Sequence, residues 1–382
     1  MKQYDVVIVG GAIAGSVAAR FLAEKGFKTL LVESAKVPRE KPCSAIQFRY
    51  FEKIIGEKIP EDKLCTNPLT KLYMEWPNGK TFSMGYKMLN FTRDVFDYWL
   101  NEVAMDAGTE FRDGVRCREF ERVDNKFIVS LYPMQKEPEK VKTKYLIAAD
   151  GLSSIIRKKM RPQDFYGKGE KARAITLNYY LETKNDGDLD PNTLYQFWNM
   201  NFNNMMFAWV YKKNDLWVIG TAYTEDIKTH CDLLFEYVKK KFNIDGEIVK
   251  KEGFAFKLKI DRPNHIYLGE DNLLITGDAA GLIEMYRGLG MDAAALSGRR
   301  AAGAILNAEQ TGSYAIEFYE KSMRKLVKRI NKNATRTLMN LKDNNDLQRY
   351  LKKNFLKMGM GTLIGSLLNK VLPGNKQILL PR

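Results

Sequence analysis

The chain has 382 residues, which is enough for two domains or for one large discontinuous pair. Hydrophobic residues make up 45% of it and aromatic residues 12%, so we expect a substantial packed core and exclude a disordered chain. The formal net charge is +15, which suits nucleic acid, an anionic membrane surface, an acidic protein partner or phosphorylated substrates. A general lysine bias of the source proteome explains this charge equally well.

The cysteine and histidine content excludes several kinds of site. The four cysteines, Cys43, Cys65, Cys117 and Cys231, are too widely spaced for a metal knuckle and suggest no secretory disulfide framework. With only two histidines, neither a His-rich metal site nor a serine-type triad is expected, and we predict no metal. We also expect no signal peptide, and no apolar run reaches the ~20 residues that span a bilayer. The chain is therefore predicted to be cytoplasmic, with peripheral membrane contact left open.

The first 33 residues have the pattern of a dinucleotide-binding βαβ unit. An apolar run at residues 6–9 predicts a buried parallel strand, residues 14–25 predict a helix, and residues 29–32 predict a second strand. A bare glycine-rich turn in an ordinary βαβ unit is the alternative. The order of strand, helix, strand and terminal acid favours the dinucleotide site.

Four residues would give this unit its chemistry. Gly10 permits a tight turn, Ala12 is small enough for the backbone to approach a pyrophosphate, and Gly15 lets helix and strand pack closely. The helix N-terminus would face the phosphates. Glu33 follows ~20 residues on, where a carboxylate can accept both ribose hydroxyls. An acid at this place favours FAD or NAD over a cofactor with a 2′-phosphate.

Further along, strand and helix patterns alternate, and the charged residues 135–144 are interpreted as a solvent loop. The predicted strands are 72–76, 81–84, 114–122, 126–132, 145–149, 207–211, 216–223, 254–260 and 273–275. The predicted helices are 49–55, 92–107, 226–242 and 291–306, followed by a basic helical tail from 317 to 382.

Two more strands end in an aspartate. The strand that ends at residue 149 is followed by Asp150 and Gly151, and the strand at 273–275 is followed by Gly277 and Asp278. Ligands of α/β sheets bind at the carboxyl ends of strands, so both carboxylates are candidates for a nucleotide site. The turn and helix start at 288–291 would offer backbone N–H groups to a flavin carbonyl or an oxyanion. Singly, each aspartate is more typical of a turn or a helix cap.

Taken in order, Gly10, Glu33, Arg93, Asp150-Gly151 and Gly277-Asp278 resemble the FAD-dependent enzymes of the p-hydroxybenzoate hydroxylase fold. Within that class the chain looks most like the geranylgeranyl reductases, including the archaeal digeranylgeranylglycerophospholipid reductases. The resemblance covers most of residues 1–310. Two further segments are similar to reductase motifs, Lys41-Pro42-Cys43 and the run from Phe207 to Lys212. For Arg93, a helix-start cation paired with Asp94 or Asp97 is the alternative.

The resemblance implies an α/β fold with a Rossmann-like FAD-binding domain, an inserted antiparallel-sheet substrate domain and a helical C-terminal region. The FAD-binding domain would be discontinuous, comprising residues 1–70, 88–165 and 262–310. The substrate domain would comprise residues 71–87 and 166–261, and the basic C-terminal region residues 311–382.

The resemblance also implies three sets of site residues. The cofactor set is Gly10, Gly11, Ala12, Ile13, Ala14, Gly15, Glu33, Ser34, Cys43, Arg93, Val115, Asp150, Gly151, Asp278, Gly288, Gly290 and Met291. The substrate set is Trp198, Phe207, Trp209 and Tyr211. The catalytic candidates are Cys43, Tyr211 and Tyr195 as proton donors, with Cys43 the first choice. For Cys43, a small buried residue without a role is an equal alternative.

The implied function is FAD-dependent reduction of carbon–carbon double bonds in isoprenoid or other apolar substrates. The runner-up is a monooxygenase or halogenase that acts through a peroxyflavin, and a third alternative is a non-catalytic prenyl-binding protein. The chain has no second glycine-rich βαβ unit, so electrons would come from NADPH or reduced ferredoxin. The expected partners are an apolar or lipid substrate and an acidic electron carrier, with no nucleic acid.

Overall fold

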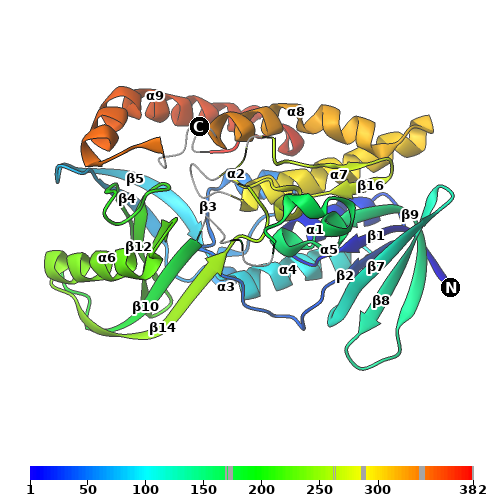
Figure 1. Cartoon of the computed structure of the whole chain (residues 1–382), viewed down its shortest axis with the longest axis horizontal. Coiled ribbons are helices and arrows are strands. Elements are labelled where there is room, and N and C mark those ends of the chain that lie inside the picture. The colour runs from blue at the N-terminus through cyan, green and yellow to red at the C-terminus, as the bar shows by residue number, and fades with distance from the viewer. Residues whose placement is uncertain are drawn as a thin grey trace.

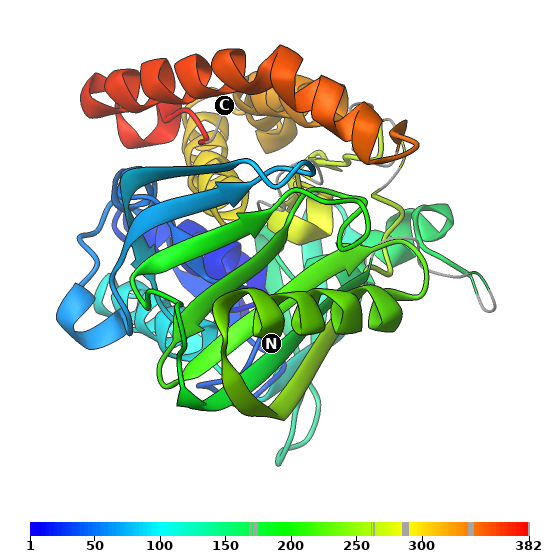
Figure 2. The ribbon, with the colours of Figure 1, turned by 90° about the vertical axis from the view of Figure 1, so that its left-hand side faces the viewer.

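Two sheets lie side by side, and a layer of long helices runs along one edge of the molecule (Figure 1). The computed structural model describes residues 1–167, 170, 175–260, 262, 264–284, 290–334 and 340–380. Figure 2, turned to bring one end forward, shows the second sheet in front of the first, with the same helical layer above both.

The first sheet is parallel at its centre, in the order β15-β16-β9-β1-β2-β6. A hairpin of β7 and β8 extends it through antiparallel pairing of β8 with β9. The strands are β1 Lys2–Val9, β2 Thr29–Val32, β6 Glu110–Arg112, β7 Val115–Val123, β8 Lys126–Pro133, β9 Glu139–Ala148, β15 Gly269–Glu270 and β16 Leu273–Ile275. β2 is buried along its whole length, as an apolar parallel strand covered on both faces must be.

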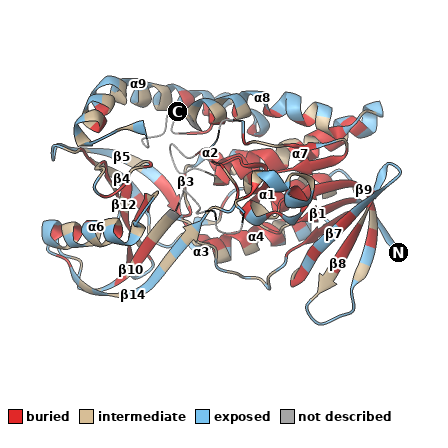
Figure 3. Cartoon of the chain, in the orientation of Figure 1, coloured by how far each residue is buried: buried red, intermediate tan, exposed pale blue. Residues whose placement is uncertain are grey.

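Helices built from small residues pack tightly against this sheet. α1 (Ile13–Ala23) contacts both α4 (Arg93–Asp106) and α7 (Met291–Thr311). A Cβ on Gly298 of α7 would lie 2.1 Å from the backbone oxygen of Ala14, so the two helices touch backbone to backbone. Figure 3 shows the buried residues concentrated in this part of the molecule. The shorter helices are α2 Tyr50–Ile55, α3 Glu61–Leu64 and α5 Ile155–Met160, with 3-10 turns at Gly151–Ser153, Pro162–Asp164, Gly277–Ala280 and Gly374–Lys376.

The second sheet is largely antiparallel, in the order β14-β10-β13-β12-β11-β4-β5-β3, and only β11 and β4 pair in parallel. α6 (Ile227–Phe242) packs on one of its faces through contacts with β10 and β13. The strands are β3 Ile46–Gln47, β4 Leu69–Glu75, β5 Thr81–Asn90, β10 Ile175–Asn185, β11 Thr193–Phe197, β12 Ala208–Lys213, β13 Leu216–Tyr223 and β14 Asp245–Ala255.

The helical layer consists of α8 (Ala315–Ala334) and α9 (Asn344–Val371). α9 is fixed at both ends. At its start, Asn344 Oδ1 accepts a hydrogen bond from the Met200 N–H at 2.8 Å. At its end, Lys53 of α2 donates to the backbone oxygen of Asn369 at 2.8 Å, and the Asn369 side chain exchanges two 2.7 Å hydrogen bonds with the backbone of Ile378 in the following segment. In between, Phe355 packs its ring against Trp76 and Phe82 of the second sheet.

The fold class inferred from the sequence is confirmed, but two strands are placed differently. The strand expected at 254–260 ends at Ala255 and belongs to β14, which begins at Asp245. Most residues of β14 are exposed, and its pairing with β10 rather than an apolar pattern places it in the sheet.

β9 begins at Glu139, so most of the segment expected to be a loop at 135–144 is strand. In its first half Val141 and Thr143 are buried, whereas the charged residues Glu139, Lys140 and Lys142 are exposed or half-buried, which accounts for the charged sequence. Within the described part of the chain, no helix is long and apolar enough to cross a membrane.

Candidate active site

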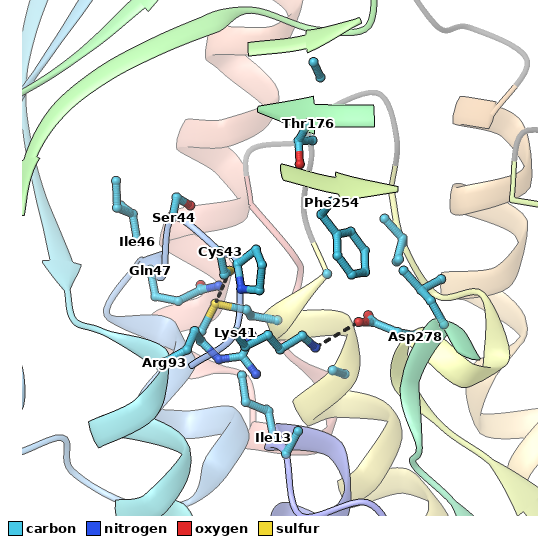
Figure 4. A pocket seen from close by; sticks show the side chains of 18 of the residues that line it. Ile13, Lys41, Cys43, Ser44, Ile46, Gln47, Arg93, Thr176, Phe254 and Asp278 are labelled. Atoms are coloured by element: carbon cyan, nitrogen blue, oxygen red, sulfur yellow. Dashed lines mark hydrogen bonds and ion pairs between the residues drawn. The ribbon is translucent and has the colours of Figure 1, made fainter. Parts of the chain in front are cut away.

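A cavity of about 960 Å³ lies between the two sheets. One side is lined by the carboxyl ends of the first-sheet strands, with Gly10, Glu33, Asp150 and Asp278. The other side is lined by apolar side chains of the second sheet and of α9. Three strand ends that are far apart in the chain therefore meet in one crevice, and part of it is shown in Figure 4.

The turn between β1 and α1 requires glycine at two positions. Gly10 has φ +111°, and a Cβ there would lie 2.3 Å from the backbone oxygen of Ala149. A Cβ on Gly15 would lie 1.9 Å from the backbone oxygen of Gly10. Gly15 therefore lies behind the turn and does not line the cavity, whereas Ala12, Ile13 and Ala14 do. Ala12 caps α1 without a side-chain hydrogen bond, so the first helical amides are left to a ligand.

Glu33 is held rigidly where β2 ends. Its Oε2 accepts a hydrogen bond from the Gly11 N–H, and its Oε1 accepts one from the Ala35 N–H, both at 3.0 Å. The hydroxyl of Ser34 donates to the same Oε1 at 3.1 Å, and Ser34 also lines the cavity. Gly11 does not line the cavity, because its amide is directed to Glu33. The sequence-predicted acid is thus buried but faces the crevice.

Asp150 carries an unsatisfied oxygen. Its Oδ2 accepts the Ile155 N–H at 2.9 Å, but its buried Oδ1 has no hydrogen-bond partner among the described residues. Burial raises the pKa of Asp150. Gly151 and Val115 line the cavity beside it. A buried polar atom without a partner costs stability in the free protein, so this oxygen is suited to accept a hydroxyl or N–H of a bound molecule.

The third strand end places Asp278 opposite Lys41. Lys41 Nζ lies 3.2 Å from Asp278 Oδ2, and Figure 4 shows this pair across the crevice. Gly290 and Met291 begin α7 and line the cavity next to Asp278. Gly288, predicted from the sequence as part of this turn, lies outside the described residues.

Cys43 and Arg93 lie at the centre of the cavity lining. The Cys43 thiol donates to Met291 Sδ at 3.7 Å and accepts the Ala45 N–H at 3.4 Å. Arg93 donates two hydrogen bonds of 2.8 Å to the carboxylate of Asp97. Burial lowers the pKa of Arg93, but the Asp97 carboxylate outweighs it and raises the pKa overall. The pairing with Asp97 that the sequence left open is present, and Arg93 still faces the cavity.

The aromatic side of the cavity includes the four predicted substrate residues, Trp198, Phe207, Trp209 and Tyr211. Trp209 Nε1 donates to Asn178 Oδ1 at 2.9 Å, which fixes the indole. Burial raises the pKa of the Tyr211 hydroxyl above its ordinary value.

Tyr195 does not line the cavity, so the structure does not support it as a donor to this site. Its neighbours Leu194 and Gln196 face the cavity, whereas Tyr195 points to the α6 side, because successive side chains of a strand alternate. Its hydroxyl accepts the Asp190 N–H at 2.7 Å, and its ring packs on Phe242.

Two features of the site and its surroundings were missed from the sequence. The first is a set of apolar liners, of which Met74, Met88, Phe254, Phe256, Phe355 and Met358 are examples. The liners that lie on strands could have been predicted from the alternation of side chains, if it had been known which face of each strand lines the cavity. The second is Lys213, which does not line the cavity but is buried next to it and donates to the backbone oxygens of Ser44, a lining residue, and Phe91. Burial lowers the pKa of Lys213 to about 8.

Comparison with known proteins agrees with a flavin site. The fold and the site define an FAD-dependent oxidoreductase. The chain belongs to the FAD binding domain family, whose pattern matches residues 78–334.

Two curated relatives are reductases. A digeranylgeranylglycerophospholipid reductase of Methanococcus vannielii is 24% identical, over 97% of this chain and 96% of its own length. A geranylgeranyl diphosphate reductase of Rhodobacter capsulatus is 28% identical, over 82% of this chain and 78% of its own.

Solved structures share the fold at low identity. A geranylgeranyl bacteriochlorophyll reductase-like protein of Thermoplasma acidophilum has a TM-score of 0.76 and 18% identity, and the match covers 100% of this chain and 95% of that one. A p-nitrophenol 4-monooxygenase of Pseudomonas putida has a TM-score of 0.73 and 16% identity, with 99% and 100% covered. The fold is thus common to reductases and monooxygenases.

The residues present fit FAD. The bare α1 N-terminus suits the pyrophosphate, and the fixed carboxylate of Glu33 suits ribose hydroxyls. The orphaned oxygen of Asp150 and the strand-end carboxylate of Asp278 offer two further acceptors.

Proposed function

We propose that the protein reduces carbon–carbon double bonds of isoprenoid or similarly apolar substrates with reduced FAD. The observation that carries the proposal is the apolar part of the cavity. Beyond the strand ends it is lined by aromatic, methionine and leucine side chains from β4, β5, β11, β12, β14 and α9. Such a lining suits a hydrocarbon chain, and polar side chains such as Asn178 and Gln196 are a minority of it.

Different residues of the chain would hold FAD, place the alkene and donate the proton in such a reaction. Bound and reduced, FAD supplies the hydride. The α1 N-terminus, Glu33, Asp150 and Asp278 would hold and orient it. The apolar lining excludes water and places the alkene. A proton must reach the second alkene carbon, and Cys43 is our first choice as its donor, because it lines the cavity at the junction of its two sides. Tyr211 is the second choice.

The electron donor is proposed to be NADPH or reduced ferredoxin. The sequence has no second glycine-rich βαβ unit that would form a permanent nicotinamide site. The net charge of +15 suits transient contact with an acidic carrier protein.

The relatives support the reductase proposal by name, whereas the shared fold leaves a monooxygenase as the competing function. Photoreduced enzyme mixed anaerobically with geranylgeranyl lipid should reoxidise and yield a product with two more hydrogens. Mixed with oxygen, the reduced enzyme should accumulate no peroxyflavin. Aerobic oxygen insertion into an aromatic substrate would instead establish the monooxygenase. Purified protein that is colourless and gains nothing from added FAD would indicate a binding protein.

A further inference from the structure

α9 has apolar side chains on two different faces. Toward the interior, Leu351, Phe355, Met358 and Thr362 line the cavity. The outward stripe consists of six residues that are between 48% and 79% exposed, namely Leu356, Met360, Leu363, Ile364, Leu367 and Val371. Their spacing of three or four residues puts them on one side of the helix. Figure 3 shows the outer side of α9 largely in the colour of exposed residues.

The two faces meet at Leu363. Residues on a helix are ~100° apart, so Leu356 is rotated by roughly 140° from Leu351, which is five positions earlier. Leu363 is 62% exposed and also lines the cavity. Met84 of β5 is 48% exposed and lines the cavity too. The cavity therefore comes to the surface along α9, next to the outward stripe.

Positive charge borders this stripe. Lys352, Lys353, Lys357 and Lys370 are exposed on α9, and the sequence has no acidic residue from 347 to 371. α8 carries exposed Lys321, Arg324, Lys325 and Lys328, and both ribbon views place α8 and α9 along the same edge of the molecule (Figures 1 and 2). An apolar helix face bordered by lysines is the pattern of a helix that lies in a membrane interface.

We propose that α9 docks the protein on a membrane surface with anionic lipid headgroups, and that apolar substrate passes from the bilayer beside Leu363 into the cavity. A second copy of the chain is a poorer occupant, because it would bring like charges together across the contact. The docking stands on the exposed stripe and the lysines, while the route of the substrate rests on the proposed function. Since the stripe covers one face only, the helix would lie in the plane of the interface.

Flotation with lipid vesicles tests the docking without any assay of activity. The FAD-loaded protein should bind vesicles of equal parts phosphatidylcholine and phosphatidylglycerol, and added salt should weaken this binding. We expect the double variant Leu356→Glu/Leu367→Glu to bind at least about tenfold more weakly, and Lys352→Glu/Lys353→Glu to lose a similar factor. Neither pair lines the cavity. Leu233→Glu, at a 49% exposed position on α6, is the matched control and should bind as the unaltered protein does.

Absence of vesicle binding by the unaltered protein would overturn the proposal. So would self-association in sedimentation that Leu356→Glu/Leu367→Glu abolishes while vesicle binding stays unchanged. The route is tested by reoxidation of reduced enzyme with geranylgeraniol, presented in vesicles or in detergent micelles. The stripe variants should slow only the vesicle reaction. If no reoxidation occurs in either medium but vesicle binding follows the predicted pattern, the proposed function fails and the docking stands.

Discussion

The thiol of Cys43 lies 3.7 Å from the thioether of Met291, at the point where the loop after β2 meets the start of α7. This contact puts the thiol at the junction between the polar strand ends and the apolar part of the cavity. Cys43, predicted from the sequence as the proton donor, thus lines the cavity, and its role as a donor stays a prediction.

Replacing Cys43 tests that role. We expect Cys43→Ala to slow flavin reoxidation by the alkene by about a hundredfold or more, since a positioned acid contributes ~10²–10⁴ in rate. FAD affinity, measured by titration of the apoprotein, should change little. Tyr195→Phe is the control on the α6 side and should leave the rate unchanged. A normal rate in Cys43→Ala would transfer the role to Tyr211, which Tyr211→Phe then tests.

We expect Asp150 to lower the stability of the apoprotein and to strengthen FAD binding. Its folded-state pKa is raised by burial, so its contribution to stability is complete below the unfolded pKa and is lost as pH rises through the folded pKa. Asp150→Asn should therefore stabilise the apoprotein at neutral pH and remove this part of the pH dependence. It should also weaken FAD by ~1–3 kcal/mol, the cost of a lost buried hydrogen bond. Urea denaturation of the apoprotein and FAD titration measure the two effects. Unchanged FAD affinity would contradict the assignment of the orphaned oxygen to the cofactor.

The α1 turn should tolerate no side chain at Gly15. In Gly15→Ala the new Cβ would meet the Gly10 oxygen at 1.9 Å, so we expect a loss of about 3 kcal/mol in the free energy of unfolding and weaker FAD binding. Gly303→Ala in α7 is the matched control, because nothing lies within 4 Å of its Cβ. It should gain about 0.5–1 kcal/mol from helix propensity. Thermal unfolding of both variants measures the contrast, and equal effects would refute the close-packing explanation.

We expect Lys213 to make the free energy of unfolding vary with pH in the alkaline range. Burial lowers its pKa from 10.5 to about 8, so between these values the unfolded chain binds more protons than the folded one. The free energy of unfolding should rise with pH in that window, by at most ~1.4 kcal/mol per pH unit. Lys213→Met should remove this rise, whereas Lys240→Met, at an exposed position on α6, should keep it. Urea midpoints at the two ends of the window give the measurement, and an identical rise in both variants would exclude Lys213 as its source.

The strand ends of the flavin motifs could be predicted from the sequence, because each depends on local pattern. Glu33, Asp150 and Asp278 each follow a short apolar run, and parallel strands bring their carboxyl ends together. Which side chains of the second sheet face the cavity could not be predicted in this way. Tyr195 lies in the same aromatic-rich segment as Tyr211, and only the pairing of Tyr195 with Val210 shows that the two tyrosines face opposite sides.

The lining contributed by α9 was also beyond the sequence. This segment was predicted only as part of a basic helical tail, whereas Phe355 packs against Trp76 through tertiary contacts that no local pattern encodes. The strand β9 was misplaced for a related reason. Its charged first half pairs with β8 on one side and, from Val141 on, with β1 on the other. This pairing depends on partner strands and not on local hydrophobicity.

The anchoring of α9 at both ends limits how the cavity can widen. At its start Asn344 accepts a hydrogen bond from the Met200 amide, and near its end Lys53 of α2 donates one to the backbone oxygen of Asn369. Because both ends of α9 are hydrogen-bonded to the rest of the protein, the helix cannot swing outward about one end. Any widening of the cavity beside Leu363 would therefore have to come from the middle turns of α9 or from the β4–β5 hairpin, whose Phe82 packs against Phe355.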